Sequence, residues 1–322
     1  MIAELELEKE VEAVAAVDEE RFTWAHCSNH QFWMNGCNDC SLINLLAEQS
    51  DFESYFAKSD IVPLEIRIKD PNPRFQLIRQ QLARVFAMFF AKAKKKAVAA
   101  ALTKTREFVK FGKTEQLTEK QKEAIILAAY TAIRWNELID GVTTDLLAAA
   151  QSGAAEGLIQ VQDSSEETVA KVNDFSQEYA RNRAAEMIGK KYEEDTLVEN
   201  PTAKFVIANT TKDDLRDVIE QSFEKQETLT ELQERILNAA TFSDLRSQLI
   251  ATNEVALAQV AGNLVAWKNQ VSKVAIRLSD DHTVYDQCDL LVENGPYDIN
   301  HVPLIPSHPH CHCVLYAINE DL

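Results

Sequence analysis

The chain has 322 residues, with 51 Asp or Glu against 33 Lys or Arg, and a formal net charge of -18. Because phosphate binding depends on Lys and Arg, this balance argues against a protein whose main task is to coat nucleic acid. No segment approaches the roughly 18–20 consecutive apolar residues that cross a bilayer, and the first residues lack the basic and apolar regions of a signal peptide. We therefore expect a soluble protein, cytoplasmic at synthesis, with no membrane partner.

Three sections are predicted along the chain. Residues 1–62 hold an acidic leader with a first Cys/His cluster, residues 63–200 form a helical region, and residues 201–322 form a C-terminal module. Glycine and proline are scarce, at 8 each, and the middle is rich in strong helix formers. We expect a mainly α-helical fold with a small α+β C-terminal module, in which a few short strands surround a Cys/His loop.

The first Cys/His cluster contains Cys27, His30, Cys37 and Cys40. Two pairs of potential ligands, each separated by two residues and joined by a short loop, are typical of a zinc knuckle or ribbon. In the alternative interpretation, the aromatic residues of the loop fill a core. The spacing favours one structural zinc ion bound by these four side chains.

A long helix is predicted over residues 73–110. Apolar residues recur there at helical spacing and form a broad stripe. The stripe consists of Phe75, Ile78, Leu82, Phe86, Phe89 and Phe90. The run Lys92–Lys96 is interpreted as a solvated face of this helix, with contact to DNA or to an acidic partner as the functional alternative.

Further helices are expected over residues 118–191, with breaks near Gly141, Gly153 and Asp163. Helix starts are indicated by capping boxes, in which a Ser or Thr oxygen accepts from a free backbone N–H and an acid or amide three residues later reaches back. These boxes are Thr118 with Gln121, Ser164 with Glu167, Thr211 with Asp214, Thr228 with Glu231, and Thr241 with Asp244.

After residue 201, three helices precede a change to the alternating pattern of strands, at residues 274–278 and 314–318. The loop between these strands holds Cys288, His308, Cys311 and Cys313. Cys311 and Cys313 point to one face of an extended segment, and the four side chains would satisfy tetrahedral zinc with no open position. In one alternative the cysteines are small buried hydrophobes; in another, a Cys/His pair such as Cys313 with His308 is a nucleophile and base.

The closing segment His308–Cys313 has the form His-Pro-x-Cys-x-Cys, and the predicted helix Arg246–Val255 contains Ile-Ala-x-x-Glu. The first is similar to the His-Pro-Asn-Cys-Arg-Cys signature of the Mu F-like head morphogenesis family of tailed bacteriophages, and the second resembles the helix that opens the family domain. Asp281-His282-Thr283, followed by Cys288, looks like the family's Asp-x-Arg-Thr segment. Gly153–Gly157, Tyr179–Arg181 and Asn209–Thr211 resemble the helical lead-in.

The resemblance implies a minor head protein that is needed to build an infectious phage head. Its partners would be the portal protein, the major capsid protein or a scaffold protein, with weak contact to packaged DNA as a further option. It would be present in the virion, at the portal vertex or inner capsid, and in the host cytoplasm during assembly. Family members carry no agreed catalytic residues, so a non-enzymatic protein is expected. The alternatives are a zinc-containing module that binds nucleic acid and a hydrolase dependent on Cys or zinc.

Overall fold

The computed structural model describes residues 73–109, 117–163, 165–279, 282, 285–308 and 311–318. Over these ranges the chain is mostly helical, with short antiparallel strands concentrated near the C-terminus, which confirms the predicted fold class. The first Cys/His cluster (Cys27, His30, Cys37 and Cys40) lies outside the described residues. The helices are α4 (Pro73–Phe108), α5 (Glu119–Thr131), α6 (Asn136–Val161), α7 (Glu166–Glu186), α8 (Ile207–Glu224), α9 (Leu229–Leu237), α10 (Asp244–Trp267) and α11 (Gln287–Glu293), with a 3-10 turn, η3 (Ala240–Phe242), before α10.

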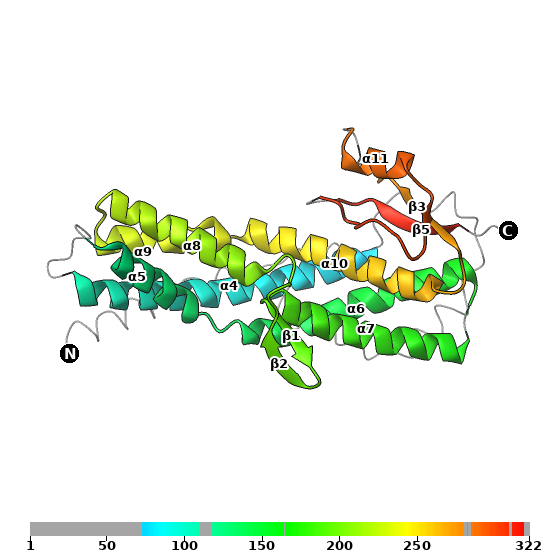
Figure 1. Ribbon diagram of the computed structural model, residues 1–322, viewed down its shortest axis with the longest axis horizontal. Coiled ribbons are helices and arrows are strands. Elements are labelled where there is room, and N and C mark those ends of the chain that lie inside the picture. The colour runs from blue at the N-terminus through cyan, green and yellow to red at the C-terminus, as the bar shows by residue number, and fades with distance from the viewer. Residues whose placement is uncertain are drawn as a thin grey trace, which may run out of the picture. The chain divides into compact units, whose positions relative to one another are not determined.

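The largest core lies between α4 and the helices that pack on it. The stripe predicted on α4 is buried, and Leu82, Phe86 and Phe90 have no exposed surface. Helices α5, α6, α9 and α10 contact α4, and α10 runs alongside α4 and α6 (Figure 1). This core combines side chains from residues 75 to 258, so helices of the second and third predicted sections share it.

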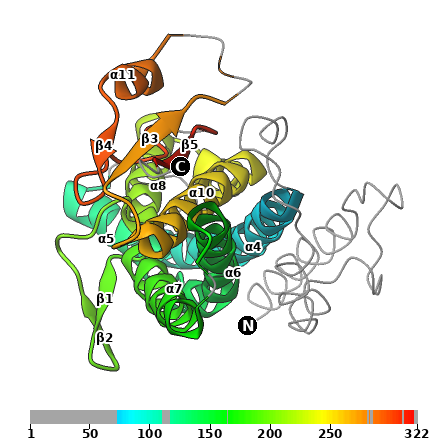
Figure 2. The same ribbon diagram turned by 90° about the vertical axis from the view of Figure 1, so that its right-hand side faces the viewer.

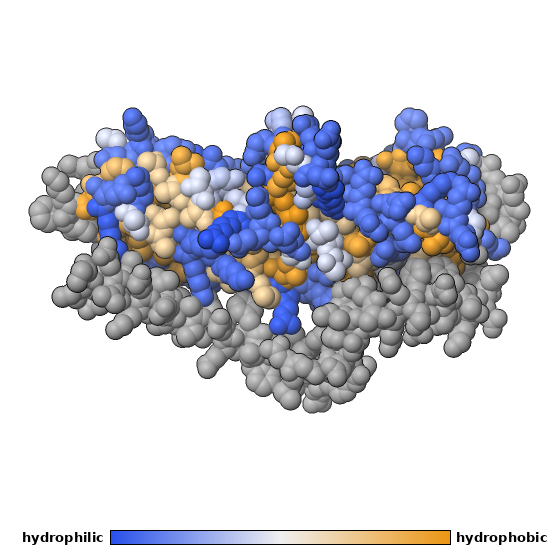
Figure 3. Space-filling view, turned by 90° about the horizontal axis from the view of Figure 1, so that it is seen from below, coloured by the Kyte–Doolittle hydropathy of each residue, from blue (hydrophilic) through white to orange (hydrophobic). Residues whose placement is uncertain are grey.

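Within the lysine run of α4, Lys92 is exposed and the intervening Ala93 is buried. Lys96 lies 3.6 Å from Glu137 of α6, an ion pair whose two side chains are both partly exposed. On the face shown in Figure 3, hydrophilic residues interleave with smaller apolar areas. The exposure of Lys92 and the partly exposed Lys96–Glu137 pair agree with the interpretation of the run as a solvated helix face.

Helix α6 passes without a break through Gly141 and Gly153, so the two predicted breaks are wrong. Gly153 is needed inside the helix because of a tertiary contact: a Cβ there would lie 2.2 Å from the carbonyl oxygen of Gln259 on α10. In the opposite direction, a Cβ on Gly262 of α10 would lie 2.0 Å from the carbonyl oxygen of Ala150. These two glycines therefore let two helix backbones touch. The third predicted break, near Asp163, is confirmed, since α6 ends at Val161.

Two of the predicted capping boxes are confirmed, at Thr118 of α5 and Thr228 of α9. The cap of α7 is Ser165, one residue after the predicted Ser164, which is outside the described residues. The capping predictions for Thr211 and Thr241 are wrong. Thr211 lies inside α8 and Thr241 lies in η3, and the hydroxyls of both contact the Arg246 guanidinium.

A hairpin of β1 (Lys190–Glu193) and β2 (Thr196–Glu199) lies within residues 63–200, so the expectation of strands in the C-terminal module alone is corrected. In β1 only Tyr192 is apolar, and the apolar residues of β2, Leu197 and Val198, are adjacent, so neither strand shows an alternating apolar pattern. The predicted strands at 274–278 and 314–318 are confirmed as β3 (Lys273–Arg277) and β5 (Val314–Ile318). Residues 297 and 298 form β4 (Tyr297–Asp298), which pairs with the other edge of β3.

A second, smaller core joins this sheet to the helices. It contains Trp267 at the end of α10, the inward residues of β3 and β5, and three cysteines. The Trp267 indole donates to the carbonyl oxygen of Gly157 at 3.2 Å, and the backbone N–H of Ala317 donates to the Gln160 side chain. The sheet thus lies over α10, on the side away from α7 (Figure 2).

Among the described helices, α10 alone is long and apolar enough to cross a membrane. It packs against α4, α6 and α7. It also carries Glu254, a carboxylate that is buried in an ion pair with Arg183 of α7. These contacts identify α10 as a core helix in this fold.

Candidate metal centre

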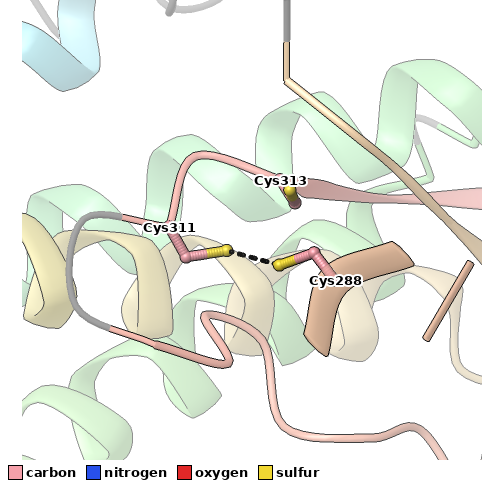
Figure 4. Close-up of side chains that lie close together, drawn as sticks. All are labelled: Cys288, Cys311 and Cys313. Atoms are coloured by element: carbon pink, nitrogen blue, oxygen red, sulfur yellow. Dashed lines mark hydrogen bonds between the residues drawn. The ribbon is translucent and has the colours of Figure 1, made fainter. Parts of the chain in front are cut away.

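Three cysteine thiols meet between α11 and the loop that precedes β5. The Sγ atoms of Cys288 and Cys311 are 3.5 Å apart, and the three Sγ atoms, with that of Cys313, all lie within 4.8 Å of one another. Cys288 comes from the first turn of α11, whereas Cys311 and Cys313 come from the segment before β5. Figure 4 shows the first two side chains pointing toward each other. The structure therefore brings together the three cysteines predicted as C-terminal ligands.

Local structure holds Cys288 in place at the start of α11. The Asp286 carboxylate accepts from the backbone N–H of Cys288 at 2.6 Å, and the Asp289 carboxylate accepts from the backbone N–H of Asp286 at 2.8 Å. This is a capping box that satisfies two free N–H groups at the helix start. On the other side of the cluster, Cys313 directly precedes β5, which pairs with β3 along its length.

His308, the fourth predicted ligand, lies beside the thiols. Its Nε2 atom is 3.3 Å from the Cys288 Sγ atom and 3.2 Å from an Asp286 carboxylate oxygen. Asp286, Cys288 and His308 form a second group with spacing suited to a metal ion, and Cys288 belongs to both groups. The Ser307 hydroxyl is also within 3.1 Å of the Cys288 Sγ atom.

The thiols are shielded from solvent and perturb one another. Cys288, Cys311 and Cys313 are 0%, 2% and 6% exposed. A hydrogen bond from the Cys313 thiol lowers the pKa of Cys311 to about 4, and by the same bond the pKa of Cys313 is raised. Burial raises the pKa of Cys288 to about 11. Without a cation the site thus favours one thiolate held by protonated neighbours, and a divalent cation would stabilise further thiolates.

The sequence interpretation did not single out Asp286 or Asp289 as part of this site. The signal was available, because Asp286 followed three residues later by Asp289 has the spacing of a capping box. Asp289 also accepts from His282, whose Nε2 atom is 2.7 Å away. This hydrogen bond raises the pKa of His282. The pKa of Asp289 is lowered, first by the backbone N–H of Asp286 and then by His282.

The predicted nucleophile and base were Cys313 and His308. The Nε2 atom of His308 instead lies beside both Cys288 and Asp286. A reactive thiolate needs access to its substrate, and the burial of all three thiols limits access to anything larger than a small molecule. His301, another histidine of the same loop, is exposed, and its Nδ1 atom lies 3.5 Å from an Asp298 carboxylate oxygen.

Two other motif segments are joined by buried polar contacts in the helical body. Arg183 of α7 and Glu254 of α10 form a two-pronged ion pair with N–O distances of 2.7 and 2.6 Å, and both side chains are less than a tenth exposed. Arg246 donates to the Thr210 and Thr211 hydroxyls at 2.5 and 2.9 Å. Through Glu254 and Arg246, which belong to the motif Arg246–Val255, helix α10 is thus connected to Arg183 of α7 and to the motif Asn209–Thr211 of α8.

No family model matches the chain, and no curated protein or solved structure matches it either.

Proposed function

We propose that this chain is a non-enzymatic assembly protein, a minor head protein of a tailed phage, whose C-terminal module is held together by a structural zinc ion. The observation that carries the proposal is the buried group of Cys288, Cys311 and Cys313 beside His308. Structural zinc sites are closed, whereas catalytic ones keep a position open for water or substrate. Three buried thiols and a histidine are a ligand set of the closed kind.

The spacing of the side chains supports zinc as the metal. A tetrahedral zinc ion with Zn–S bonds of about 2.3 Å holds its sulfurs about 3.8 Å apart. The Cys288 and Cys311 Sγ atoms, 3.5 Å apart, are close to that separation. Soft thiolate ligands also favour zinc over magnesium or calcium. The fourth ligand that we propose is His308, with the Asp286 carboxylate as the neighbour that would replace it.

A metal at this position would have a clear structural role. The small core contains eight buried residues, three of them cysteines, so few apolar side chains hold the sheet, α11 and the loop before β5 together. A zinc ion that bridges α11 and this loop would supply folding free energy that so small a core lacks.

The head-protein assignment is supported by how the motif residues are used. Arg246 and Glu254 each bind a side chain of a neighbouring helix, and Gly153 allows close helix packing. The closing motif supplies the cysteine cluster. In each of these cases the motif residue joins two elements of the fold, so its role is accounted for by structure without a catalytic step.

Mass spectrometry of purified phage particles tests the assignment. A minor head protein should be found in mature heads at few copies per particle, and cross-linking should connect it to the portal protein or to the inner capsid surface. Absence from both mature heads and their assembly precursors would contradict the proposal.

Elemental analysis of the purified full-length chain tests the metal. In a variant with Cys27, Cys37 and Cys40 replaced by Ser, we expect about one zinc ion per chain, bound by the C-terminal site. Replacing Cys288, Cys311 and Cys313 by Ser in that background should remove the metal. Circular dichroism serves as the folding control, because the helical body has a separate core. A retained zinc ion in the second variant, or none in the first, would overturn the assignment of this site.

A further inference from the structure

We propose that oxidation converts Cys288 and Cys311 into a disulfide that takes the place of the metal as the link between α11 and the loop before β5. This inference rests on the proposed zinc site and adds its regulation. The two Sγ atoms are 3.5 Å apart, and their side chains point toward each other (Figure 4). A disulfide bond of about 2.0 Å requires the sulfurs to approach by about 1.5 Å.

The third thiol is less suited to pairing. Cys313 directly precedes β5, and the next residue, Val314, is paired with Arg277 of β3. A movement of Cys313 toward either partner would therefore disturb the end of the sheet. Cys311 lies two residues farther from the strand, in a segment without ladder hydrogen bonds. We therefore expect Cys288 and Cys311 to pair and Cys313 to remain a thiol.

The oxidant that we invoke is a peroxide, which is small enough to reach a buried thiol. One thiolate attacks the peroxide and becomes a sulfenic acid, and the second thiolate then displaces water from it. In total, two metal-bound thiolates, one hydrogen peroxide and two protons give one disulfide, two waters and a free zinc ion. The two electrons pass from the sulfurs to the peroxide oxygens. The metal leaves because two of its ligands no longer carry charge.

The exchange would suit a protein that is made in one redox environment and persists in another. Thiols stay reduced in the cytoplasm, whereas disulfides persist outside the cell. A zinc bridge would hold the module during assembly, and the disulfide would hold the same two segments, 23 residues apart in sequence, after release. The C-terminal module would then no longer depend on the metal.

The test uses the full-length chain with Cys27, Cys37 and Cys40 replaced by Ser, loaded with zinc and treated with hydrogen peroxide. Released zinc is measured with a chelating dye, and peptides are mapped by mass spectrometry without reduction. We expect about one zinc ion released per chain, together with a linked peptide pair that contains Cys288 and Cys311. A reductant should restore zinc binding. A chelator should lower the melting temperature of the untreated protein but not that of the oxidised protein.

Two further substitutions in the same background identify the pair. Cys313→Ser should leave the Cys288–Cys311 link in place, whereas Cys311→Ser should abolish it. A link through Cys313 in the parent protein, zinc retained after peroxide, or oxidation to sulfinic acid without any link would each overturn the inference. If the parent binds no zinc and the link still forms, the zinc proposal fails and the disulfide stands. If it binds zinc and no link forms, only the redox inference fails.

Discussion

Replacing Gly262 by Ala tests whether direct backbone contact between α6 and α10 holds the helical body together. The added Cβ would lie 2.0 Å from the carbonyl oxygen of Ala150 and 2.6 Å from the backbone nitrogen of Ala154. Both atoms belong to the backbone of α6, so no side-chain rotation relieves the clash. The helices would have to separate by about 1 Å before the closest contact reached even 3.0 Å.

The expected loss of stability is the difference between two effects. Overpacking a well-packed contact costs about 1–3 kcal/mol, and backbone atoms on both sides place this site at the upper end. Ala is favoured over Gly inside a helix by about 1 kcal/mol. We therefore expect Gly262→Ala to lower the free energy of unfolding by about 2 kcal/mol.

Gly141→Ala on α6 is the matched control. Its Cβ would meet only a side-chain methyl group of Val85, at 3.0 Å, and a side chain can shift. The helix preference should then offset the contact, so that stability stays unchanged or rises by up to about 1 kcal/mol. Urea unfolding is followed by circular dichroism, with zinc and reductant held constant. The unfolding midpoints of the variants report their stabilities when the slopes of the free energy against urea concentration are equal. A Gly262→Ala midpoint at or above that of the unchanged protein would refute the close-contact argument.

Two buried charged sites give further predictions. Arg183→Met should lower the free energy of unfolding by about 3–5 kcal/mol, because it leaves the buried Glu254 carboxylate without its partner. A double variant that also carries Glu254→Met should lose less stability than the sum of the losses of the two single variants. Additive losses in denaturant unfolding would contradict this coupling. Burial raises the pKa of Asp145 to about 6, so its contribution to stability is fully present below the unfolded pKa near 4 and is lost as the pH rises through 6. The stability of Asp145→Asn relative to the unchanged chain should rise between pH 4 and pH 8, by up to about 3 kcal/mol, and a difference that is the same at both pH values would show the reasoning to be wrong.

Much of the local structure could be predicted because its causes lie within a few residues of one another. The apolar stripe of α4, the capping boxes at Thr118 and Thr228, and the alternating burial of β3 each depend on neighbours along the chain. The grouping of Cys288, Cys311 and Cys313 was also predictable. These residues flank a loop, and His308 and the two later cysteines are only two or three residues apart.

The remaining features depend on contacts between distant segments. Gly153 is a helix breaker by local preference, yet it lies inside α6 because its missing side chain admits the backbone of α10, more than a hundred residues later. Arg183 binds a carboxylate 71 residues away, and Thr211 is held inside α8 beside Arg246 of another helix. Sequence pattern therefore determined which segments are helices and strands, since backbone and side-chain preferences are local. Only the tertiary structure decided which glycines, charges and hydroxyls join those segments, because each of those roles requires a partner that folding brings near.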